Sequence, residues 1–382
     1  MELNDLLRQT SRSFYLTLRV LPAAVRPQIG LAYLLARTTD TIADTELVPL
    51  AQRLAALQAL RGRILGPSAA PLDFGALARS QAAPAERALL ENVEAALAEL
   101  QKLSAADRQL TRAVLDTITS GQELDLQRFQ SERKSTSALT PALSPGKREN
   151  VADPLANPTL PNLSQRGNEK LPLPGERVGV RAEQSTEIIA LRTDAELDDY
   201  TYRVAGCVGE FWTKICRAHV FPNAKFDDAQ FLADGIRFGK GLQLVNILRD
   251  LPADLRNGRC YLPADGLAKL GLSPNDLLNP ASELKLRPLY SEWLDRAEAH
   301  LAAGWAYTNS LPWRCIRVRL ACAWPILIGV ETLARLRAAN VLAADQRVKI
   351  TRADVRRLMW RSVLFYPLPG RWQRLARLPS AI

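Results

Sequence analysis

Apolar residues recur every three or four positions along most of this chain, and no stretch alternates apolar and polar residues as a half-buried strand would. Ala, Leu, Arg and Glu are in excess, whereas runs of β-branched residues are few, which favours helices. Predicted helices span 47–65, 84–103, 105–121, 231–250 and 291–308, with stops at Gly66-Pro67 and Ser120-Gly121. The pattern predicts an all-α fold.

The most apolar stretch, 320–330, lies between Arg319 and Glu331. It is shorter than the roughly 18 residues that a membrane span needs, so we expect a buried helix. The N-terminus lacks a basic region followed by an apolar core, which argues against a secretory signal. Five cysteines without a C-x-x-C pair favour reduced thiols over a zinc site or disulfide framework. We therefore expect a cytoplasmic protein.

Residues 130–192 break the helical pattern, because they contain seven of the 24 prolines and no aromatic residue. Such a segment buries too little apolar surface to offset its ordering entropy, so we expect a disordered insertion in a single domain that spans 1–382. The runs Leu-Pro-Leu-Pro-Gly-Glu-Arg and Leu-Thr-Pro-Ala-Leu-Ser-Pro-Gly look like a translated bacterial genomic repeat. An inert insertion is our main interpretation, and a regulatory linker is the alternative.

The net charge of +10 is concentrated at the C-terminal end, where residues 335–382 carry +9 and the rest of the chain carries +1. Bulky residues such as Trp360, Leu364 and Trp372 are interleaved with these arginines, which suits peripheral contact with an anionic bilayer, such as the inner face of a bacterial membrane. A solvated arginine-rich helix is the alternative. Residues 1–330 show no basic and aromatic surface pattern or motif for nucleic acid, so we expect no such partner.

Two aspartate pairs stand out as candidate metal ligands: Asp40 with Asp44, and Asp250 with Asp254. Carboxylates four residues apart lie on one helix face, about 6 Å from each other. Both can then bind Mg²⁺, which prefers oxygen ligands and often shares them with substrate phosphates. A single pair is weak evidence, since two acids at this spacing commonly form a solvated face.

The residues around each pair strengthen this interpretation. Tyr33 and Arg37 share the helix face of the first aspartate pair, inside an otherwise apolar sequence. A buried charge must be paired or bind an ion. On the second helix, Gln243 and Asn246 share the face of Asp250.

Arg249 and Arg259 flank the second pair and could bind phosphate oxygens. Pro252 lies between its two aspartates, where we expect it to bend or end the helix.

Four motifs in order resemble those of the squalene/phytoene synthase family, and are most similar to the squalene synthases. They are Ser11-Arg12-Ser13-Phe14, the stretch from Tyr33 to Asp44, the Tyr200–Gly209 stretch with its Val-Ala-Gly-Cys-Val-Gly, and the stretch from Leu242 to Asp254 with the tail Gly258-Arg259-Cys260-Tyr261-Leu262-Pro263. Together they cover roughly residues 10 to 330.

The resemblance implies an isoprenoid-synthase-type helical bundle around a central cavity. It implies that both aspartate pairs hold Mg²⁺ ions for the diphosphates of two prenyl donors. Arg12, Arg37, Arg249 and Arg259 match positions associated with diphosphate binding, and we include Gln243 and Asn246 in the same group. Tyr33 and Tyr200 match tyrosines near the reacting carbons, Tyr200 being the expected proton-handling group. With Arg37, they are the expected catalytic residues.

The implied reaction joins two farnesyl diphosphates head to head through presqualene diphosphate, followed by reduction with NADPH to squalene. Cys322-Ala323-Trp324-Pro325 resembles a Cys-Ala-x-Pro element of squalene synthases, although Ile326 stands where those proteins have Gln. The alternatives are a phytoene, dehydrosqualene, presqualene diphosphate or hydroxysqualene synthase without reduction, and a non-catalytic relative that acts in assembly. The sequence identifies neither the NADPH ligands nor the oligomeric state.

Overall fold

The computed structural model describes residues 3–11, 14–45, 47–66, 71–138, 187–225, 227–343 and 348–376. The elements of the N-terminal half are α1 (Leu3–Thr10), α2 (Phe14–Val20), α3 (Arg26–Asp44), α4 (Leu50–Leu65), α5 (Gly75–Arg79), α6 (Pro84–Glu91), α7 (Val93–Lys102) and α8 (Ala105–Ala138). The C-terminal half begins with strand β1 (Ile189–Ala190), α9 (Asp194–Thr201), the π-helix η1 (Tyr202–Gly206), α10 (Cys207–His219), α11 (Asp228–Arg256) and strand β2 (Arg259–Cys260). It ends with α12 (Ala264–Lys269), the 3₁₀ turns η2 (Pro274–Leu278) and η3 (Pro280–Ser282), α13 (Glu283–Ser310), α14 (Ile316–Ala338), α15 (Arg352–Phe365), α16 (Pro369–Gln373) and the 3₁₀ turn η4 (Arg374–Ala376).

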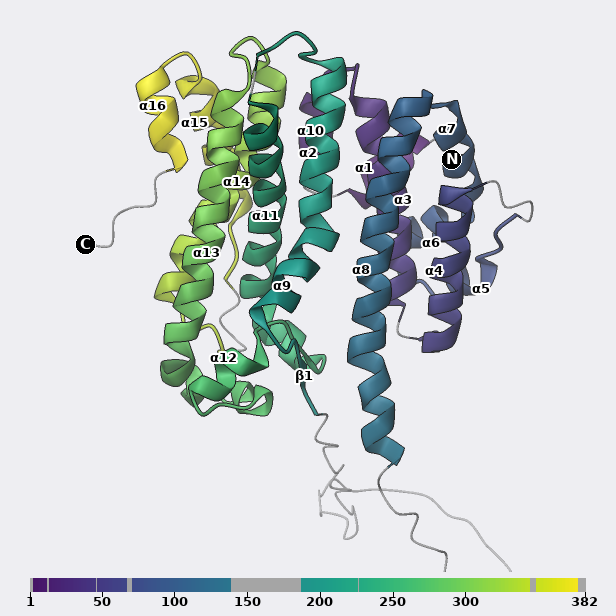
Figure 1. Ribbon diagram of the computed structural model, residues 1–382, viewed down its shortest axis with the longest axis vertical. Coiled ribbons are helices and arrows are strands. Elements are labelled where there is room, and N and C mark those ends of the chain that lie inside the picture. Colours follow the sequence, from purple (N-terminus) through teal and green to yellow (C-terminus); the bar gives the residue numbers. More distant parts are fainter. Residues whose placement is uncertain are drawn as a thin grey trace, which may run out of the picture.

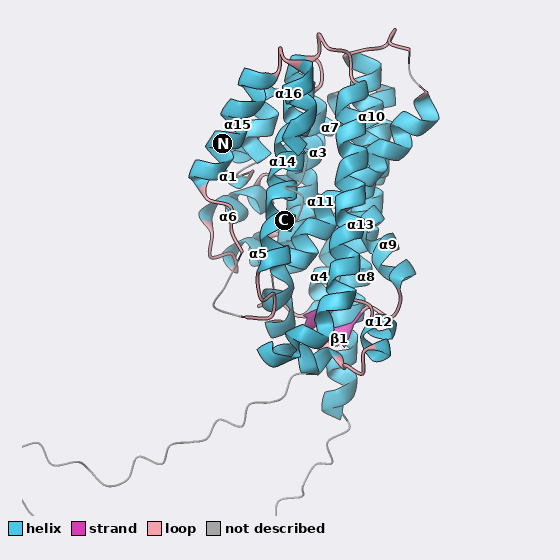
Figure 2. Cartoon of the chain, turned by 90° about the vertical axis from the view of Figure 1, so that its left-hand side faces the viewer, coloured by secondary structure: helices cyan, strands magenta, loops and turns pink. Residues whose placement is uncertain are grey.

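The long helices run roughly along one axis and form a bundle (Figure 1). Helices α3 and α4 pack with α8 on one side, α11, α13 and α14 pack together on the other, and α10 lies between α8 and α11 (Figures 1 and 2). Short helix α12 and strand β1 lie at one end of the bundle, and α15 with α16 at its other end. The predicted all-α fold is confirmed.

Several predicted helix bounds differ from the structure: 231–250 lies within α11 and 291–308 within α13, both of which are longer than predicted. Two further differences have an identifiable cause. The expected helix 84–103 is interrupted at Asn92, whose side-chain amide donates to the carbonyl of Ala88 at 2.7 Å and competes with the helical backbone. The expected stop at Ser120-Gly121 is wrong, because α8 continues through it to Ala138. Gly121 serves a packing role instead, since a Cβ there would lie 2.9 Å from the Cβ of Arg203.

Pro252 does not end α11 as expected, because the helix continues to Arg256. A proline cannot donate to the carbonyl four residues earlier, here that of Leu248. The buried hydroxyl of Tyr290 donates to this carbonyl at 2.9 Å. The lost backbone hydrogen bond is therefore replaced by a side chain of α13, and Asp254 stays on the same helix as Asp250.

The predicted insertion is narrower than 130–192, because ordered elements extend into both of its ends. Helix α8 covers 130–138, and Ile189–Ala190 pairs in parallel with Arg259–Cys260. Residues 139–186, the bulk of the predicted insertion, lie outside the described residues. None of the described helices is long and apolar enough to cross a membrane.

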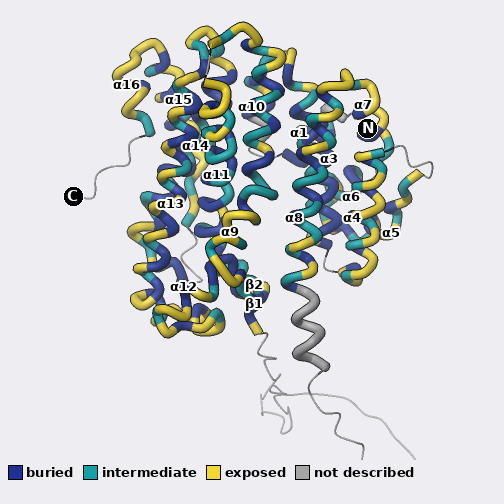
Figure 3. Tube along the Cα trace, in the orientation of Figure 1, coloured by how far each residue is buried: buried dark blue, intermediate teal, exposed yellow. Residues whose placement is uncertain are grey.

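Helices α10 and α11 approach each other closely at glycines. A Cβ at Gly209 would overlap the carbonyl oxygen of Gly235, and one at Gly239 would overlap that of Ala205. This close contact lies beside η1, where the Val-Ala-Gly stretch adopts a π-helix. Such π-helical turns are often found at functional sites. The contact fixes α11, and with it the second aspartate pair, relative to α10. Buried residues, dark blue in Figure 3, recur along both helices.

We predict that Gly209→Ala destabilises the protein by about 1–3 kcal/mol or more, because the backbone carbonyl that it meets cannot move aside cheaply. Gly62→Ala is the matched control: this exposed position of α4 has no atom within 4 Å of the added Cβ. We expect the control to gain about 0.5–1 kcal/mol from lower backbone entropy. Chemical denaturation of both variants measures the difference, and equal stabilities would contradict the close packing.

Candidate active site

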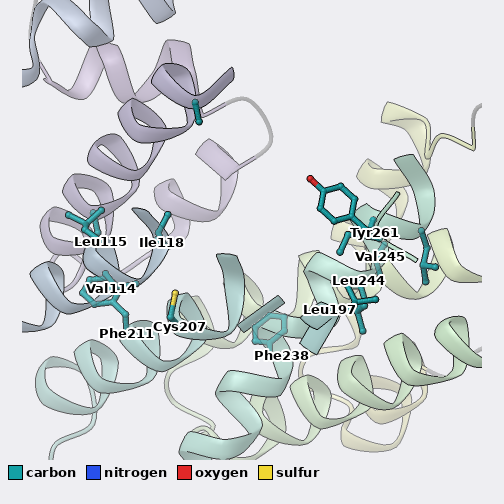
Figure 4. Close-up of a cluster of buried hydrophobic side chains, with 14 of the residues drawn as sticks. Val114, Leu115, Ile118, Leu197, Cys207, Phe211, Phe238, Leu244, Val245 and Tyr261 are labelled. Atoms are coloured by element: carbon teal, nitrogen blue, oxygen red, sulfur yellow. The ribbon is translucent and has the colours of Figure 1, made fainter. Parts of the chain in front are cut away.

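A cavity of about 530 Å³ lies between α3, α8, α10, α11, α14 and α15. Most of its wall is apolar and includes Val114, Ile118, Phe211, Trp212, Phe238 and Ile328. Figure 4 shows Val114 of α8 beside Phe211 of α10, with Phe238 of α11 further along the same cluster. Among the described residues that line the cavity, Arg249 is the only charged one, and Tyr33 and Asn246 also contribute polar groups. The cavity therefore joins a large apolar volume to a small polar region.

The first aspartate pair lies on α3, about two and three turns beyond Tyr33. Arg37 binds Glu86 of α6 at 2.6 Å and lies 3.9 Å from Asp40, whose carboxylate also accepts a hydrogen bond from Gln122 of α8. Although 46 % of the Asp40 side chain is exposed, loss of hydration among the surrounding atoms and the charge of Asp44 raise its pKa to about 6. Arg37 and Gln122 act in the opposite direction but do not cancel the shift.

The second pair lies on α11 at the end of the cavity where Asn246 and Arg249 line the wall. Arg249 donates two hydrogen bonds to Asp250, at 3.0 Å from Nε and 2.5 Å from one terminal nitrogen. Burial and the charge of Asp250 raise the pKa of Asp254 to about 7, and Arg259 lowers it less than these raise it. Negative charge at this end is therefore only partly neutralised by the arginines.

Asp125 of α8 connects the two pairs. Its carboxylate accepts a hydrogen bond from the Tyr261 hydroxyl at 3.1 Å and lies 4.0 Å from Arg259. Burial raises its pKa to about 6, and the charge of Asp44 adds to this shift, while Asp125 in turn raises the pKa of Asp254. Carboxylates from α3, α8 and α11 thus lie within electrostatic range of one another, although the sequence separates them by more than 200 residues.

Tyr200 of α9 lies beside this cluster and stacks on Tyr261, with 4.8 Å between the ring centroids. Burial and the field of Asp125 raise the pKa of the Tyr200 hydroxyl far above its ordinary value, so that it keeps its proton at neutral pH. The side of Figure 4 that shows Tyr261 lies across the hydrophobic cluster from Val114 and Phe211.

The family profile of squalene/phytoene synthases matches residues 7–354 of this chain. The chain belongs to the squalene/phytoene synthase family. Members of this family are prenyltransferases that join prenyl diphosphates head to head.

Curated relatives match parts of the chain. A 15-cis-phytoene synthase of Enterobacter agglomerans is 33% identical over 153 residues, which are 39% of this chain and 47% of that protein. A presqualene diphosphate synthase of Rhodopseudomonas palustris is 35% identical over 128 residues, 32% of this chain and 42% of the relative. The matched stretches span less than half the length of each of these relatives.

Solved structures of similar fold cover nearly the whole chain. The complex of TcSQS with the ligand E5700 superimposes with a TM-score of 0.68 at 19% identity, covering 99% of this chain and 91% of that one. Squalene synthase HpnC of Alicyclobacillus acidocaldarius gives 0.54 at 18% identity, with 88% and 92% covered. At these identities the likeness establishes the family's helical fold.

The structure brings most of the predicted family residues together. Tyr33, Asn246 and Arg249 line the cavity, and the Tyr33 hydroxyl donates to the carbonyl of Thr10 at 3.2 Å. Gln243 is half-buried on α11 but does not line the cavity, and Tyr200 lies beside the aspartate cluster, outside the cavity wall. Predicted residue Arg12 lies outside the described residues.

Sequence reasoning missed Glu86, Gln122, Asp125 and Tyr261. A local signal was available for two of them, because Gln122 and Asp125 continue the helix face that begins with Val114 and Ile118. Polar residues on an otherwise apolar face mark a site in the same way as the first aspartate pair does. Tyr261 stands in the tail of the fourth motif but was given no role there. Glu86 carries no comparable signal, since its partner Arg37 is distant in the sequence.

The donor set fits Mg²⁺. One Asp125 oxygen, Oδ1, is buried and has no hydrogen-bond partner among the described residues, and the same holds for Oε1 of Gln122. An unpaired buried carboxylate oxygen is costly unless it meets a cation. No three described His, Cys, Asp or Glu residues form a ready-made metal cluster. Each aspartate pair would therefore supply part of a coordination shell, with diphosphate and water supplying the rest.

We predict that Asp254→Asn stabilises the metal-free protein at pH 8 by on the order of 1 kcal/mol, or about 2–4 °C in Tm. The pKa of Asp254 is about 7 when folded and 3.8 ordinarily, so its charge at pH 8 is held less well in the folded state than in the unfolded state. As the pH falls from 7 toward 4, the wild-type carboxyl takes up a proton and the advantage of the variant should disappear.

The control for this pH series is Asp265→Asn, at an exposed position of α12. Its Tm difference from the wild type should stay near zero throughout. Thermal unfolding in a chelating buffer, followed by circular dichroism, checks both variants. A difference for Asp254→Asn that does not change with pH would show that the carboxylates do not repel one another as described.

Proposed function

We propose that this protein joins two farnesyl diphosphates head to head through presqualene diphosphate. The observation that carries the proposal is that both aspartate pairs lie within electrostatic range of Asp125, while Arg249, which binds Asp250, also lines one large apolar cavity. A site that ionises allylic diphosphates needs charge neutralisation for the leaving group and a water-poor pocket for the carbocation. This arrangement provides both.

Asp40 with Asp44, and Asp250 with Asp254, would hold Mg²⁺, which neutralises a diphosphate as it leaves. Glu86 holds the Arg37 guanidinium at 2.6 Å, so that it faces the first pair. Arg249 reaches the cavity while it is bound to Asp250, and Arg259 lies close to Asp125. With Arg12, these arginines would bind phosphate oxygens and orient both donors, and Asn246 and Gln243 would complete the group.

The apolar wall would hold the two prenyl chains side by side and exclude water. Tyr33 lies where it can border the reacting carbons. Tyr200 would handle the proton that the cyclopropane-forming step releases: its hydroxyl is protonated at neutral pH and belongs to a hydrogen-bonded set with Tyr261 and Asp125. Asp125, with a pKa of about 6, is the natural acceptor at the end of that set.

Reduction by NADPH to squalene is a separate part of the proposal. It is supported by Cys322, Trp324 and Pro325, which resemble the squalene synthase element and line the cavity. Ile326 weighs against it: this residue is fully buried in the core and leaves the wall beside Pro325 and Ile328 without an amide. A phytoene, dehydrosqualene, presqualene diphosphate or hydroxysqualene synthase is therefore the second candidate.

We also propose that the basic C-terminal segment makes peripheral contact with an anionic membrane surface. Between 348 and 376 the chain has seven Lys and Arg residues and one acidic residue, Asp354, which is bound to Arg335 at 2.8 Å. Trp360 and Leu364 are 74 % and 66 % exposed. Basic residues around exposed apolar ones are typical of interfacial helices.

Incubation with farnesyl diphosphate and Mg²⁺, with and without NADPH, tests the reaction. We expect presqualene diphosphate or its unreduced products without NADPH, and squalene when it is added, identified by mass spectrometry. A C30 polyene or hydroxysqualene that is independent of NADPH would assign the second candidate. Absence of any turnover would favour the non-catalytic relative.

We predict that Asp40→Ala and Asp250→Ala each reduce diphosphate release by at least about 100-fold, because each removes a metal ligand and leaves its partner carboxylate alone. Asp265→Ala, at an exposed position, is the control and should retain wild-type turnover. Phosphate analysis after pyrophosphatase treatment measures the release. Near-normal turnover in either aspartate variant would refute the metal assignment.

A further inference from the structure

Helix α15 has two different faces. On its inner face, Val355 and Met359 line the cavity, and Leu358 and Ser362 are buried. What we call the outer face of α15 consists of Arg356, Arg357, Trp360, Arg361 and Leu364, all exposed. One helix thus separates the apolar cavity from an exposed surface that is both basic and apolar.

The surface beside this outer face has the same character. Tyr366 at the end of α15 stacks on Trp313 at 4.2 Å and donates to its carbonyl at 2.5 Å, which brings the loop between α13 and α14 next to α15. Trp313 in that loop is 44 % exposed and is followed by exposed Arg314. Ile316 and Arg317, the first two residues of α14, are also exposed, Ile316 by 40 %. Charge and exposed apolar area together match an anionic bilayer rather than solvent alone.

Helix α15 is also held less extensively than the long helices α3, α8, α10 and α11 that form most of the cavity wall. It packs chiefly on α14, with a few contacts to α16, whereas α3, α8, α10 and α11 each pack against several helices. Its side-chain links to α14 include the Arg335–Asp354 ion pair at 2.8 Å near its start and the hydrogen bond from Trp324 to Ser362 at 3.0 Å. Moving it breaks fewer contacts than moving any of those four helices. Figure 1 shows α15 and α16 on the side of the bundle opposite α4 and α5.

We propose that the outer face of α15 binds an anionic bilayer and that apolar product leaves the cavity between α14 and α15, directly into the lipid. The identity of the apolar product in this inference rests on the proposed function. A C30 hydrocarbon has no diphosphate, so nothing holds it at the polar region, and transfer into water would expose its whole surface. If the product passes α15 directly into lipid, its apolar surface is never exposed to water and this free-energy cost is avoided.

Vesicle flotation tests the surface, with vesicles of phosphatidylglycerol and phosphatidylcholine compared with phosphatidylcholine alone. We expect binding to the anionic vesicles, reduced about 10- to 30-fold by Arg357→Gln with Arg361→Gln, since each arginine near the surface contributes comparably. Trp360→Ser with Leu364→Ser should also weaken binding. Controls are Arg79→Gln with Lys102→Gln, and Leu47→Ser with Leu284→Ser, both leucines being 84 % exposed elsewhere. Equal losses in the controls, or no binding by the wild type, would overturn the proposal.

A reversible cross-link between α14 and α15 tests whether the product leaves between these two helices. Arg335→Cys with Asp354→Cys replaces the ion pair between α14 and α15, and the two new thiols are joined by a disulfide-containing bismaleimide. The readout is transfer of preloaded radiolabelled squalene from the protein to anionic vesicles. We expect the cross-link to slow transfer at least tenfold with vesicle binding unchanged, and reduction of the linker to restore it. The treated wild type controls for labelling of the half-buried Cys315. Unchanged transfer in the cross-linked protein would overturn the route.

These readouts do not depend on catalysis. If squalene transfer follows the cross-link but no farnesyl diphosphate is converted, the proposed function fails and the route stands. If turnover is normal but neither transfer nor binding depends on α15, the inference fails alone.

Discussion

Burial of a group of mutually repelling carboxylates is the constraint that the helices around the candidate site must satisfy. Burial disfavours the charge of Asp40, Asp125 and Asp254 most, and the neighbouring carboxylates add to this effect: Asp44 acts on Asp40 and Asp125, and Asp250 and Asp125 act on Asp254. Arginines offset part of these effects but leave raised pKa values of about 6 to 7. A metal-free chain keeps these groups together at a cost, which the packing of the helices must offset.

Packing around α11 is what holds the carboxylates in place. Glycine contacts fix α11 against α10, and α13 makes its most extensive interface with α11. The Tyr290 hydroxyl donates to the Leu248 carbonyl and so replaces the hydrogen bond that Pro252 cannot make, next to Arg249 and Asp250. The continuation of α11 past Pro252 then helps to set the distance between Asp254 and Arg259, which the pairing of the following strand β2 with β1 also restrains. Rigid helices therefore position the charges that would otherwise separate.

The parts of the site that could be predicted from the sequence are those whose residues lie close together on a single helix. Asp40 and Asp250 stand at helical spacing from their partners, so a single helix suffices to identify each pair. Tyr261 could not be found this way, because its partner Asp125 lies 136 residues earlier. The predictions of two helix ends were wrong for a similar reason. Gly121 and Pro252 are typical helix-breaking residues when only the local sequence is considered. Their contacts with Arg203 and Tyr290 on other helices explain why they are accommodated within helices.

The polar and apolar regions of the cavity imply different requirements for substrate and product. In the proposed reaction, two diphosphates bound at one polar region would direct both prenyl chains along the same apolar wall and place their first carbons side by side. A product without diphosphates would keep no strong electrostatic contact with the wall, since Arg249 is the only charged residue among the described cavity lining. Such a product would contact only apolar side chains of the cavity. Its direction of release would then depend on which helix can move with the least loss of packing contacts, and on whether water or lipid lies behind that helix. In this bundle both considerations point to α15, whose far side carries Trp360 and Leu364 in the open.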